Sequence, residues 1–201
     1  MATENLLMVF VKNPQRGKVK TRLAKTMGDE KALQVYRILL DHTITIAKRT
    51  HCDKAIFYSD YIDETDMWRK AKFKQFVQQG NDLGERMYNA FKYAFSEHYK
   101  NVVIIGSDCF DLNEHIITDG FTILRDNEVV IGPAKDGGYY LLGMRKLYKE
   151  LFCNKQWSTE NVLLDTLLDV STLNISMKLL PTLSDIDEEK DLEVHKNLFE
   201  K

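Results

Sequence analysis

The stretch Asn101–Phe110, NVVIIGSDCF, joins a run of apolar residues to a short polar turn. The run NVVIIG has the continuous apolar character of a β-strand that is covered on both faces of its sheet. Asp108 comes two positions after the apparent end of this strand. In an open α/β sheet, ligands bind beyond the carboxyl ends of the strands, so a carboxylate at this point is a candidate functional residue.

On both sides of this stretch, short apolar runs alternate with longer amphipathic segments. Further strands are predicted at Leu6–Lys12, Lys54–Asp60, Phe73–Gln78, Glu128–Ala134, Gly138–Met144 and Asn174–Leu180. Helices are predicted at Asp29–Arg49, Asp66–Lys72, Asp82–Tyr99, Asn113–Arg125, Thr159–Asp169 and Glu188–Phe199. The alternation indicates βαβ units and a mostly parallel sheet. No helix separates Glu128–Ala134 from Gly138–Met144, so one of these two strands is expected to be antiparallel.

The predicted fold class is α/β, a three-layer α/β/α arrangement around a Rossmann-like, mostly parallel sheet with one antiparallel strand. The chain has 201 residues, which suits a single domain over residues 1–201 with a sizeable core. Hydrophobic residues make up 44% and charged residues 29%, and the formal net charge is -2. This composition is typical of a soluble protein without bulk attraction to nucleic acid or anionic lipid.

The N-terminus lacks the basic region of a signal peptide, and no apolar run is long enough to cross a bilayer. The cysteines Cys52, Cys109 and Cys153 are widely scattered, which fits a reducing compartment, and no CxxC pair suggests structural zinc. We therefore expect a cytoplasmic protein that neither inserts into membranes nor binds nucleic acid. A homo-oligomer remains possible at this stage.

A basic segment, KNPQRGKVKTRLAK (Lys12–Lys25), follows the first predicted strand. Gly17 permits a tight turn and a close approach of the backbone to a ligand. Backbone N–H groups at a helix start, together with Lys and Arg side chains, would bind a di- or triphosphate. A solvated basic loop is the alternative, and it carries equal weight. The segment matches neither a Walker A loop nor GxGxxG, which argues against P-loop NTPases and ordinary dehydrogenases.

Two carboxylates after predicted strands are candidate ligands of Mg²⁺ or Mn²⁺, because hard cations prefer oxygen donors. Asp108 is one candidate, and a helix cap is the alternative for it, although Asp111 is the better cap for a helix starting near Asn113. In SDIDEEKDL, either Asp185 or Asp187 would face a shared site, while Asp187 also suits an N-cap.

Three further segments hold candidate binding residues. The sequence Asp136-Gly137-Gly138 predicts either a loop that lines a ligand site or an ordinary Asp-Gly hairpin turn. QWST combines an aromatic residue, Trp157, with a Ser/Thr helix cap, and packing is the favoured role for this tryptophan. In QQGNDLGERM, Arg86 lies in the first turn of a predicted helix, where the helix dipole disfavours a positive charge. It is therefore expected either to bind an anion or to pair with Glu85.

Six segments in chain order resemble one family. They are FVKNPQRGKVKTRLAKTMG, QGNDLGERM, IGSDCF, GPAKDGGYYLLG, WSTENVL and LSDIDEEKDL. They resemble the bacterial glycosyltransferase-like family with the nucleotide-diphospho-sugar transferase (GT-A-like) fold, whose members are commonly labelled arsenosugar-biosynthesis glycosyltransferase-like proteins. The wider superfamily includes molybdenum-cofactor and 2-phospho-L-lactate guanylyltransferases. Phe110 stands where the family usually has proline, so the turn or the pocket wall is expected to differ there.

The resemblance implies a role for each matching position. The nucleotide and its phosphates are expected at Lys12, Pro14, Gly17, Lys20, Arg22, Gly84 and Arg86. The acceptor or sugar is expected at Asp136, Gly137, Gly138, Tyr139, Trp157 and Ser158. A Mg²⁺ or Mn²⁺ ion is expected at Asp108 and Asp187, and the catalytic residues are expected to be Asp108, Lys20 and Arg22.

The expected function is a divalent-metal-dependent transfer from a nucleotide sugar or an NTP to a small-molecule acceptor. A glycosyltransferase would release NDP, and a nucleotidyltransferase would release pyrophosphate after an acceptor phosphate attacks the α-phosphorus. Only Lys135 and Arg145 are basic near Asp136, which favours sugar transfer over a phosphate acceptor. A non-catalytic nucleotide-binding module is the third alternative, since fold alone does not exclude it.

Overall fold

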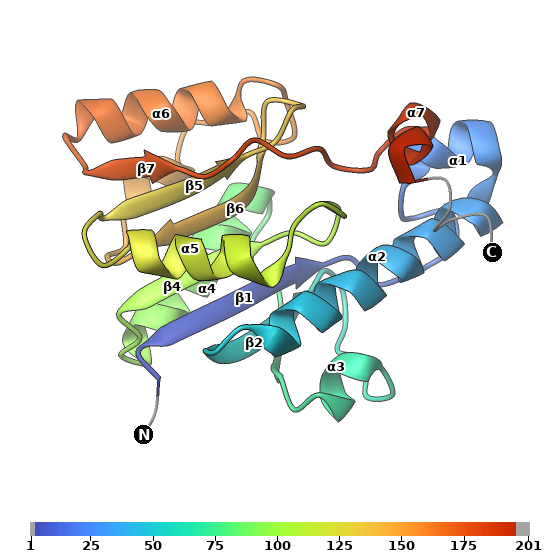
Figure 1. The fold of residues 1–201 in the computed structure, drawn as a ribbon, viewed down its shortest axis with the longest axis horizontal. Coiled ribbons are helices and arrows are strands. Elements are labelled where there is room, and N and C mark those ends of the chain that lie inside the picture. The colour runs from blue at the N-terminus through green and yellow to red at the C-terminus, as the bar shows by residue number, and fades with distance from the viewer. Residues whose placement is uncertain (1–2, 196–201) are drawn as a thin grey trace.

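A seven-stranded sheet lies at the centre of the protein (Figure 1), for which a computed structural model describes residues 3–195. The strands are β1 (Asn5–Val11), β2 (Asp53–Tyr58), β3 (Lys74–Val77), β4 (Asn101–Ile105), β5 (Val129–Pro133), β6 (Tyr139–Met144) and β7 (Met177–Leu179). Their order across the sheet is β3-β2-β1-β4-β6-β5-β7. Strand β6 runs antiparallel to β4 and β5, whereas the pairs β1–β2, β1–β4, β2–β3 and β5–β7 are parallel. The predicted mostly parallel sheet with one antiparallel strand is confirmed.

Helices cover both faces of this sheet, as the predicted three-layer arrangement requires (Figure 1). They are α1 (Thr21–Met27), α2 (Asp29–Arg49), α3 (Met67–Lys70), α4 (Leu83–Ser96), α5 (Glu114–Ile123), α6 (Val162–Thr172) and α7 (Glu189–Leu192), with the 3-10 turns η1 (Lys149–Phe152) and η2 (Glu193–His195). Helices α2 and α5 pack on one face, and α4 and α6 on the other. Within residues 3–195, every helix is too short or too polar to span a bilayer.

Strand β1 shows why the sheet needs two covering layers. Its residues from Leu6 to Val11 are all buried. Leu7 and Val9 pack with α2 and α5, whereas Leu6 and Met8 pack with α4, because successive side chains of a strand point to opposite faces. Burial on both faces explains the continuous apolar runs in the sequence.

Helix α2 has the bounds that its apolar periodicity predicts. Asp29 and Glu30 lie in its first turn, and Lys48 and Arg49 lie in its last turn, so the charges complement the helix dipole at both ends. Its buried side chains form one stripe that faces the sheet. The sequence therefore predicts this helix correctly. Its N-terminus lies close to the basic segment.

Three elements differ from the predicted ones. Helix α1 begins within the basic segment, which was predicted as a loop, and extends past it to Met27. No apolar stripe marks this helix, because Leu23 is its only buried residue in the described structure. The turn η1 was not predicted. The predicted C-terminal helix Glu188–Phe199 is shorter, with α7 followed by η2, and its residues 196–199 lie outside the described part of the chain.

Two predicted helix caps are wrong. Asn113, not Asp111, caps α5, and its Oδ1 accepts hydrogen bonds from the backbone N–H groups two and three residues later, at 3.0 and 3.1 Å. Asp111 instead lies 3.3 Å from the Nε2 of His195. The cap expected in QWST is absent because α6 begins only at Val162, and Asn161 occupies the cap position.

After β7 the chain returns along the carboxyl ends of the neighbouring strands. The backbone N–H of Leu183 donates to Pro133, which ends β5, and the N–H of Ile186 donates to the carbonyl of Asp108, beyond β4. Ile186 and Leu192 then pack against Leu23 and against the buried face of α2. This return path places α7 beside α1 (Figure 1) and brings the last acidic segment to the basic one.

Candidate functional site

Lys20 lies between two aspartates at the carboxyl end of the sheet. Its Nζ is 2.6 Å from the Oδ1 of Asp108 and 3.0 Å from the Oδ1 of Asp187. The side chain of Lys20 is 3% exposed, whereas those of Asp108 and Asp187 are 45% and 38% exposed. The three residues come from the segment before α1, the turn after β4 and the segment before α7, so the fold assembles this group from distant parts of the chain.

The backbone of Lys20 is held in a left-handed conformation, with φ 48° and ψ 46°. Its carbonyl accepts a hydrogen bond from the N–H of Ala24 and so begins α1. Left-handed backbone is unfavourable for residues other than glycine, and it persists where surrounding contacts hold it. The two ion pairs of the ammonium group are such contacts.

Tyr36 on α2 ties the ends of β1 and β4 together below Asp108. Its hydroxyl donates to the carbonyl of Lys12 at 3.0 Å, accepts from the N–H of Lys12 at 2.8 Å, and lies 3.2 Å from the Oγ of Ser107. Burial, and then the nearby charge of Asp108, raise the pKa of Tyr36 above its ordinary value. The hydroxyl therefore stays neutral and holds the residue before Asp108 in place.

Asp187 does not cap the helix that follows it. Glu188 is the N-cap residue of α7, and it forms a capping box with Asp191. The backbone N–H of Asp187 donates to the Oδ2 of Asp191 at 3.0 Å. The carboxylate of Asp187 is therefore directed at Lys20, and the N-cap interpretation of Asp187 is wrong.

Asp185 adds a third carboxylate, so the Lys20 cluster is defined here as Lys20, Asp108, Asp185 and Asp187. Burial, followed by the charges of Asp108 and Asp136, raises the pKa of Asp185 to about 7, while Lys20 opposes this rise. Burial alone would lower the pKa of Lys20, but Asp108 and Asp187 outweigh it, and the pKa is raised. The cluster holds more negative charge than one ammonium group balances, which favours a further cation.

The Lys20 cluster fits a divalent cation that also contacts substrate phosphates. Mg²⁺ sites commonly use one or two carboxylates and complete their coordination with phosphate oxygens and water. The half-exposed Asp108 and Asp187 supply such a pair. Within residues 3–195, no three Asp, Glu, His or Cys side chains group together as metal ligands. The described residues therefore form no metal cage of protein ligands alone, and a metal at Asp108 and Asp187 stays a prediction.

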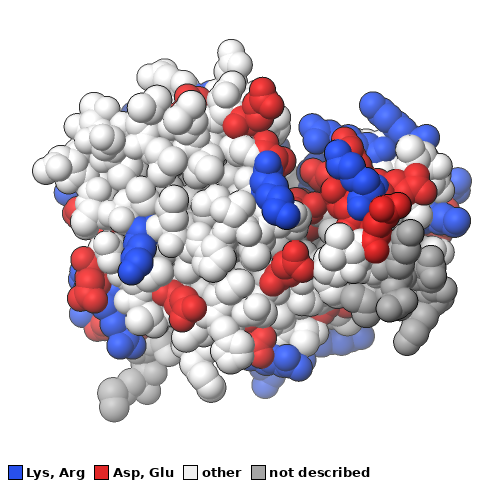
Figure 2. Space-filling view, turned by 45° about the horizontal axis from the view of Figure 1, so that its top comes forward, with Lys and Arg blue, Asp and Glu red and all other residues white. Residues whose placement is uncertain are grey.

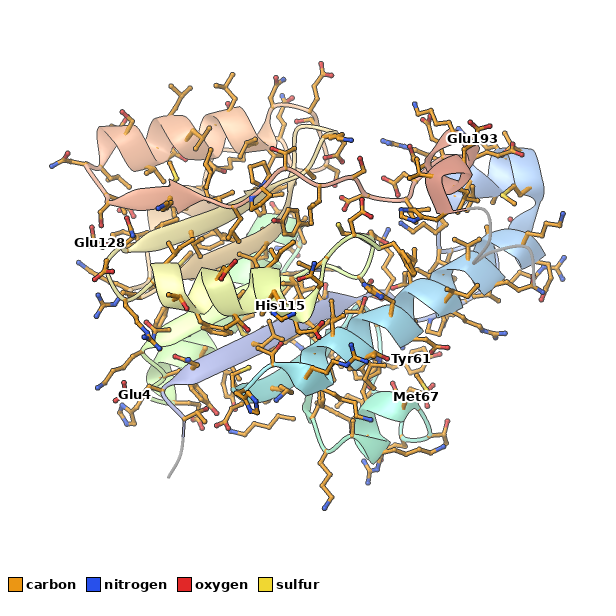
Figure 3. All side chains as sticks on the ribbon, viewed as in Figure 1. Glu4, Tyr61, Met67, His115, Glu128 and Glu193 are labelled. Carbon is orange, nitrogen blue, oxygen red and sulfur yellow. The ribbon has the colours of Figure 1, made fainter. Side chains whose placement is uncertain are left out.

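The predicted phosphate-binding residues of the basic segment divide between two places. Lys12 and Pro14 line a cavity of about 250 Å³ beside α2 and α3, whose wall includes Met67 and Trp68 (Figure 3 labels Met67). Gly17, with φ 73°, precedes α1, and the exposed Arg22 lies in the first turn of this helix. Figure 2 shows Lys and Arg side chains gathered over α1 and α7 with Asp and Glu between them, whereas the face over α6 is mostly uncharged.

The Arg86 side chain forms hydrogen bonds with the segment that precedes α4. Its Nε donates to the carbonyl of Gly80 at 3.1 Å, and its Nη1 lies 3.5 Å from the Oε1 of Gln78. Glu85, the other expected partner, instead accepts hydrogen bonds from Asn81. An anion at Arg86 stays a prediction.

The hairpin between β5 and β6 has the Asp-Gly turn that the sequence allowed. The Oδ1 of Asp136 accepts from the N–H of Gly138 at 2.9 Å, and Gly137 has φ 88°. A Cβ at Gly137 would lie 2.0 Å from the carbonyl oxygen of Glu160, so glycine is required for this close approach. Asp136 also interacts with Asp185, which places the hairpin beside the Lys20 cluster.

Trp157 brings the predicted acceptor region to the predicted nucleotide region. Its indole lies against Gly84 on α4, where a Cβ would be 2.2 Å from the indole Nε1. Ser158 has a left-handed backbone, with φ 64°. Tyr139 packs with the core cluster shared by α4 and α6. The packing role favoured for Trp157 is what the structure shows, and ligand contacts of Tyr139, Trp157 and Ser158 stay predictions.

Phe110, at the position where proline was expected, is part of the packing under α1. Its ring centroid lies 4.5 Å from that of His42 and 5.1 Å from that of His195. The residue also packs against the apolar cluster of α1, α2 and α7. The aromatic side chain thus supports helices α1 and α7, which follow Lys20 and Asp187 in the chain.

Asn13 was not singled out in the sequence, although it anchors the basic segment. It is 2% exposed, and its Oδ1 accepts from the N–H groups of Asp60 and Tyr61 at 3.0 and 3.3 Å. Its Nδ2 donates to the carbonyl of Tyr61 at 2.9 Å. The available signal was an amide side chain directly after a buried strand and before Pro14. At the opposite end of the sheet, Glu4 and Glu128 mark the edge away from this site (Figure 3).

One protein family matches residues 42–159, and its description is "Uncharacterized protein conserved in bacteria (DUF2064)". A search of curated proteins gives no match. A solved structure from Desulfovibrio desulfuricans G20, described as a "putative nucleotide-diphospho-sugar transferase", is 32% identical, with a TM-score of 0.87. The similarity covers 97% of this chain and 88% of that chain.

More distant structures share the fold. A 4-diphosphocytidyl-2C-methyl-D-erythritol synthase from Anaerococcus prevotii DSM 20548 is 10% identical, with a TM-score of 0.60 over 99% of this chain and 97% of that chain. An inositol-1-phosphate CTP transferase from T. maritima is 13% identical, with a TM-score of 0.58 over 100% of this chain and 96% of that chain. At these identities the similarity concerns the fold, and it agrees with the nucleotide-diphospho-sugar transferase fold that was predicted.

Proposed function

The chain belongs to the DUF2064 family, and we propose that it is a divalent-metal-dependent transferase that moves a sugar from a nucleotide-diphospho-sugar donor to a small-molecule acceptor. The observation that carries this proposal is the meeting of Asp108, Asp187 and Lys20 at the carboxyl end of the sheet. This edge is where open α/β sheets bind ligands. The description of the 32% identical structure supports the same class of reaction.

In this proposal the charged residues act on the diphosphate of the donor. Mg²⁺ or Mn²⁺ bound at Asp108 and Asp187 would supply charge neutralisation for the departing diphosphate. The ammonium group of Lys20 and the guanidinium of Arg22 bind the remaining phosphate oxygens through charge-assisted hydrogen bonds. The enzyme then lowers the barrier chiefly by positioning the donor and by stabilising the charge that develops on the leaving group.

The acceptor side of the proposed site is the hairpin of Asp136 and Gly138 together with the segment of Trp157. Asp136 accepts a backbone hydrogen bond from Gly138 and is exposed, and its carboxylate would bind an acceptor hydroxyl. Trp157 forms an apolar surface next to the start of α4. A carboxylate that accepts hydrogen bonds from hydroxyl groups, next to an aromatic side chain, suits a ligand with several hydroxyl groups. The proposed acceptor is therefore a sugar or another small polyol.

Nucleotidyl transfer is the second candidate function. The fold is shared with a CTP transferase and with a diphosphocytidyl synthase, and both reactions need a phosphate-binding segment and a metal. The two functions differ in their products. Sugar transfer releases a nucleoside diphosphate, whereas nucleotidyl transfer from an NTP releases pyrophosphate.

The test is an incubation of the protein with nucleotide sugars and with NTPs in the presence of Mn²⁺, followed by quantification of NDP and pyrophosphate. We expect NDP release from at least one nucleotide sugar with an added alcohol or sugar acceptor. Asp108→Asn should abolish release, and Asp111→Asn, which removes a carboxylate outside the cluster, should retain it. Tight nucleotide binding without any product would identify a non-catalytic module and refute the enzyme.

A further inference from the structure

Lys20 occupies the position between two carboxylate oxygens where the proposed metal would bind. Its Nζ contacts the Oδ1 atoms of Asp108 and Asp187 at 2.6 and 3.0 Å. Mg²⁺ binds carboxylate oxygens at about 2.0–2.1 Å, so an ion shared by these two oxygens would take the space of the ammonium group. Two positive charges in that space would also repel each other strongly. The same pair of oxygens therefore holds either Lys20 or a divalent cation.

We propose that Lys20 is an internal cation that closes the Asp108–Asp187 pair in the nucleotide-free protein and leaves it when a nucleotide diphosphate arrives, so that nucleotide and divalent metal bind cooperatively. The proposal rests on the proposed function, because it assumes a nucleotide at this edge of the sheet. It assigns Lys20 a second role, which is to keep the metal position closed until phosphate is present.

Burial explains why the lysine needs a phosphate before it leaves. The side chain of Lys20 is 3% exposed, so an ammonium group that loses both carboxylates without another anion would be a buried, unpaired charge. A divalent metal that binds without nucleotide would leave the Lys20 ammonium group buried and unpaired, so we expect the metal alone to bind weakly. A nucleotide diphosphate supplies oxygens to the ammonium group and to the metal at the same time, and this removes the penalty.

The charges around the pair favour the exchange once it is possible. Asp185 interacts electrostatically with Asp108, Asp136 and Asp187, and Lys20 is the cation that opposes them. A divalent ion balances this group of carboxylates better than one ammonium group. The exposure of Asp108 and Asp187, at 45% and 38%, leaves the pair accessible to a cation from solution.

The backbone of Lys20 is also suited to release. It is held at φ 48° and ψ 46°, immediately before the short helix α1. Such a conformation is unfavourable for lysine and persists where surrounding contacts hold it. The two ion pairs are among those contacts, so their loss weakens the hold on this backbone, and the long side chain can carry its ammonium group to a phosphate.

The primary test measures Mn²⁺ binding by electron paramagnetic resonance without any nucleotide, in the wild-type protein, Lys20→Met and Lys18→Met. Methionine has a similar length and no charge. We expect Lys20→Met to bind Mn²⁺ at least about tenfold more tightly than wild type, because the metal position is open. Lys18→Met removes the same charge from an exposed neighbour and controls for long-range electrostatics, so its affinity should stay close to wild type.

The second measurement adds UDP, GDP, CDP or ADP to the wild-type protein and to Lys20→Gln, with a protein-free titration to subtract Mn²⁺ bound by free nucleotide. In wild type, the nucleotide that binds should tighten Mn²⁺ binding at least about tenfold, and the reciprocal effect must be equal. In Lys20→Gln this coupling should be clearly smaller than in wild type, because only the direct contact between metal and phosphate remains. The glutamine variant also keeps the proposal testable if Lys20→Met does not fold.

Equal Mn²⁺ affinity in wild type, Lys18→Met and Lys20→Met would overturn the proposal, as would tight Mn²⁺ binding by wild type without nucleotide. These outcomes are separate from a failure of the proposed function. If no nucleotide binds any variant, the proposed function fails, whereas the affinity gain of Lys20→Met is measured with the metal alone. A gain without nucleotide binding would show that Lys20 occupies a metal position that serves another anion.

Discussion

Lys20 is the residue on which the site depends, because it combines a buried ammonium group, two carboxylate partners and a left-handed backbone. Lysine is almost never fully buried unless it is paired. Its partners are partly exposed and so accessible from solution, whereas the buried ammonium group always requires an anion beside it. The arrangement is therefore better suited to a binding site than to a role in stability alone.

Tyr36→Phe tests how the residue before Asp108 is positioned. The change removes the hydroxyl that pairs with both backbone groups of Lys12 and contacts Ser107, so we expect a loss of about 1–3 kcal/mol in the free energy of unfolding. We also expect nucleotide affinity to fall about tenfold, equivalent to about 1.4 kcal/mol. Urea unfolding and nucleotide titration by calorimetry measure the two effects.

Tyr99→Phe is the matched control for this change. Its hydroxyl donates to the Oδ2 of Asp53 at 2.8 Å, at the start of β2 and therefore at the opposite end of the sheet. Tyr99→Phe should also reduce the free energy of unfolding, but nucleotide affinity should stay unchanged. If both variants bind nucleotide like the wild type, Tyr36 has no part in forming the site.

The three cysteines should differ in reactivity. Burial raises the pKa of Cys109 to about 12 and that of Cys52 to about 11, so their thiolates are scarce at neutral pH. Cys153 is only half-buried. A disulfide reagent at pH 8 should therefore modify one thiol quickly, and Cys153→Ser should remove that fast phase. Rapid modification of two or three thiols in the folded protein would contradict the described burial.

Single residues were predicted unevenly from the sequence. Asp108 was identified because it follows a buried strand, and Asp187 because the family resemblance implied a second metal ligand there, with an N-cap as the alternative. Their contacts with Lys20 were not predicted, since they join distant parts of the chain, and Lys20 and Asp187 are 167 residues apart. Tyr36 looked like any other apolar position of a helix, because periodicity reports burial and not the partner of a hydroxyl.

Helices and strands were predicted correctly where the spacing of apolar residues was clear, and a helix was missed where charged residues dominate the segment. Helix α2 and the antiparallel hairpin strand both follow from periodicity and from the missing crossover helix. Helix α1 was missed because it is short and rich in Lys and Arg. Its stability comes from packing against α2 and α7, and short isolated helices are marginal without such packing.

Gly84→Ala tests the contact between α4 and the segment of Trp157. The added methyl group would approach the indole to 2.2 Å, so the tryptophan must move, and we expect a loss of about 1–3 kcal/mol in stability. Thermal unfolding and the tryptophan emission maximum report the change. In a background of Trp157→Ala, the same glycine substitution should cost much less, since the clash is gone.

Gly120→Ala on α5 is the control for a glycine replaced within a helix. Its Cβ would lie 3.7 Å from the nearest side-chain atom, which is ordinary contact, and alanine favours helix by up to about 1 kcal/mol. This variant should be neutral or more stable than the wild type. Equal losses in Gly84→Ala and Gly120→Ala would show that the indole does not sit against α4.

At the scale of the whole molecule, the layers follow from the alternation of strands and helices, but the site does not. The last strand pairs with β5 at one edge of the sheet, and the chain then returns past Pro133 and Asp108 to reach α1. Local sequence does not encode this path, because it depends on backbone hydrogen bonds between distant segments. A single domain, a cytoplasmic location and a possible homo-oligomer stay predictions.

Cooperative unfolding tests the single domain. Trp68 packs with the α2 face of the sheet, and Trp157 packs against the α4 face, so each reports one layer. In Trp157→Phe and in Trp68→Phe, the remaining tryptophan should lose its native fluorescence at the same urea concentration at which far-UV circular dichroism is lost. Midpoints that differ between the two probes within one variant would show that the layers unfold independently.

The proposed function requires a nucleotide and a divalent metal to bind together at Asp108. Its most direct test is a thermal-shift screen of nucleotide sugars and NTPs, with and without Mg²⁺ or Mn²⁺, on wild type, Asp108→Asn and Asp111→Asn. For a ligand at about 100-fold its Kd, wild type and Asp111→Asn should gain about 5–10 °C in Tm with metal and much less without it. Asp108→Asn should lose this metal dependence. If Asp108→Asn shifts with nucleotide and metal just as the wild type does, the site is elsewhere.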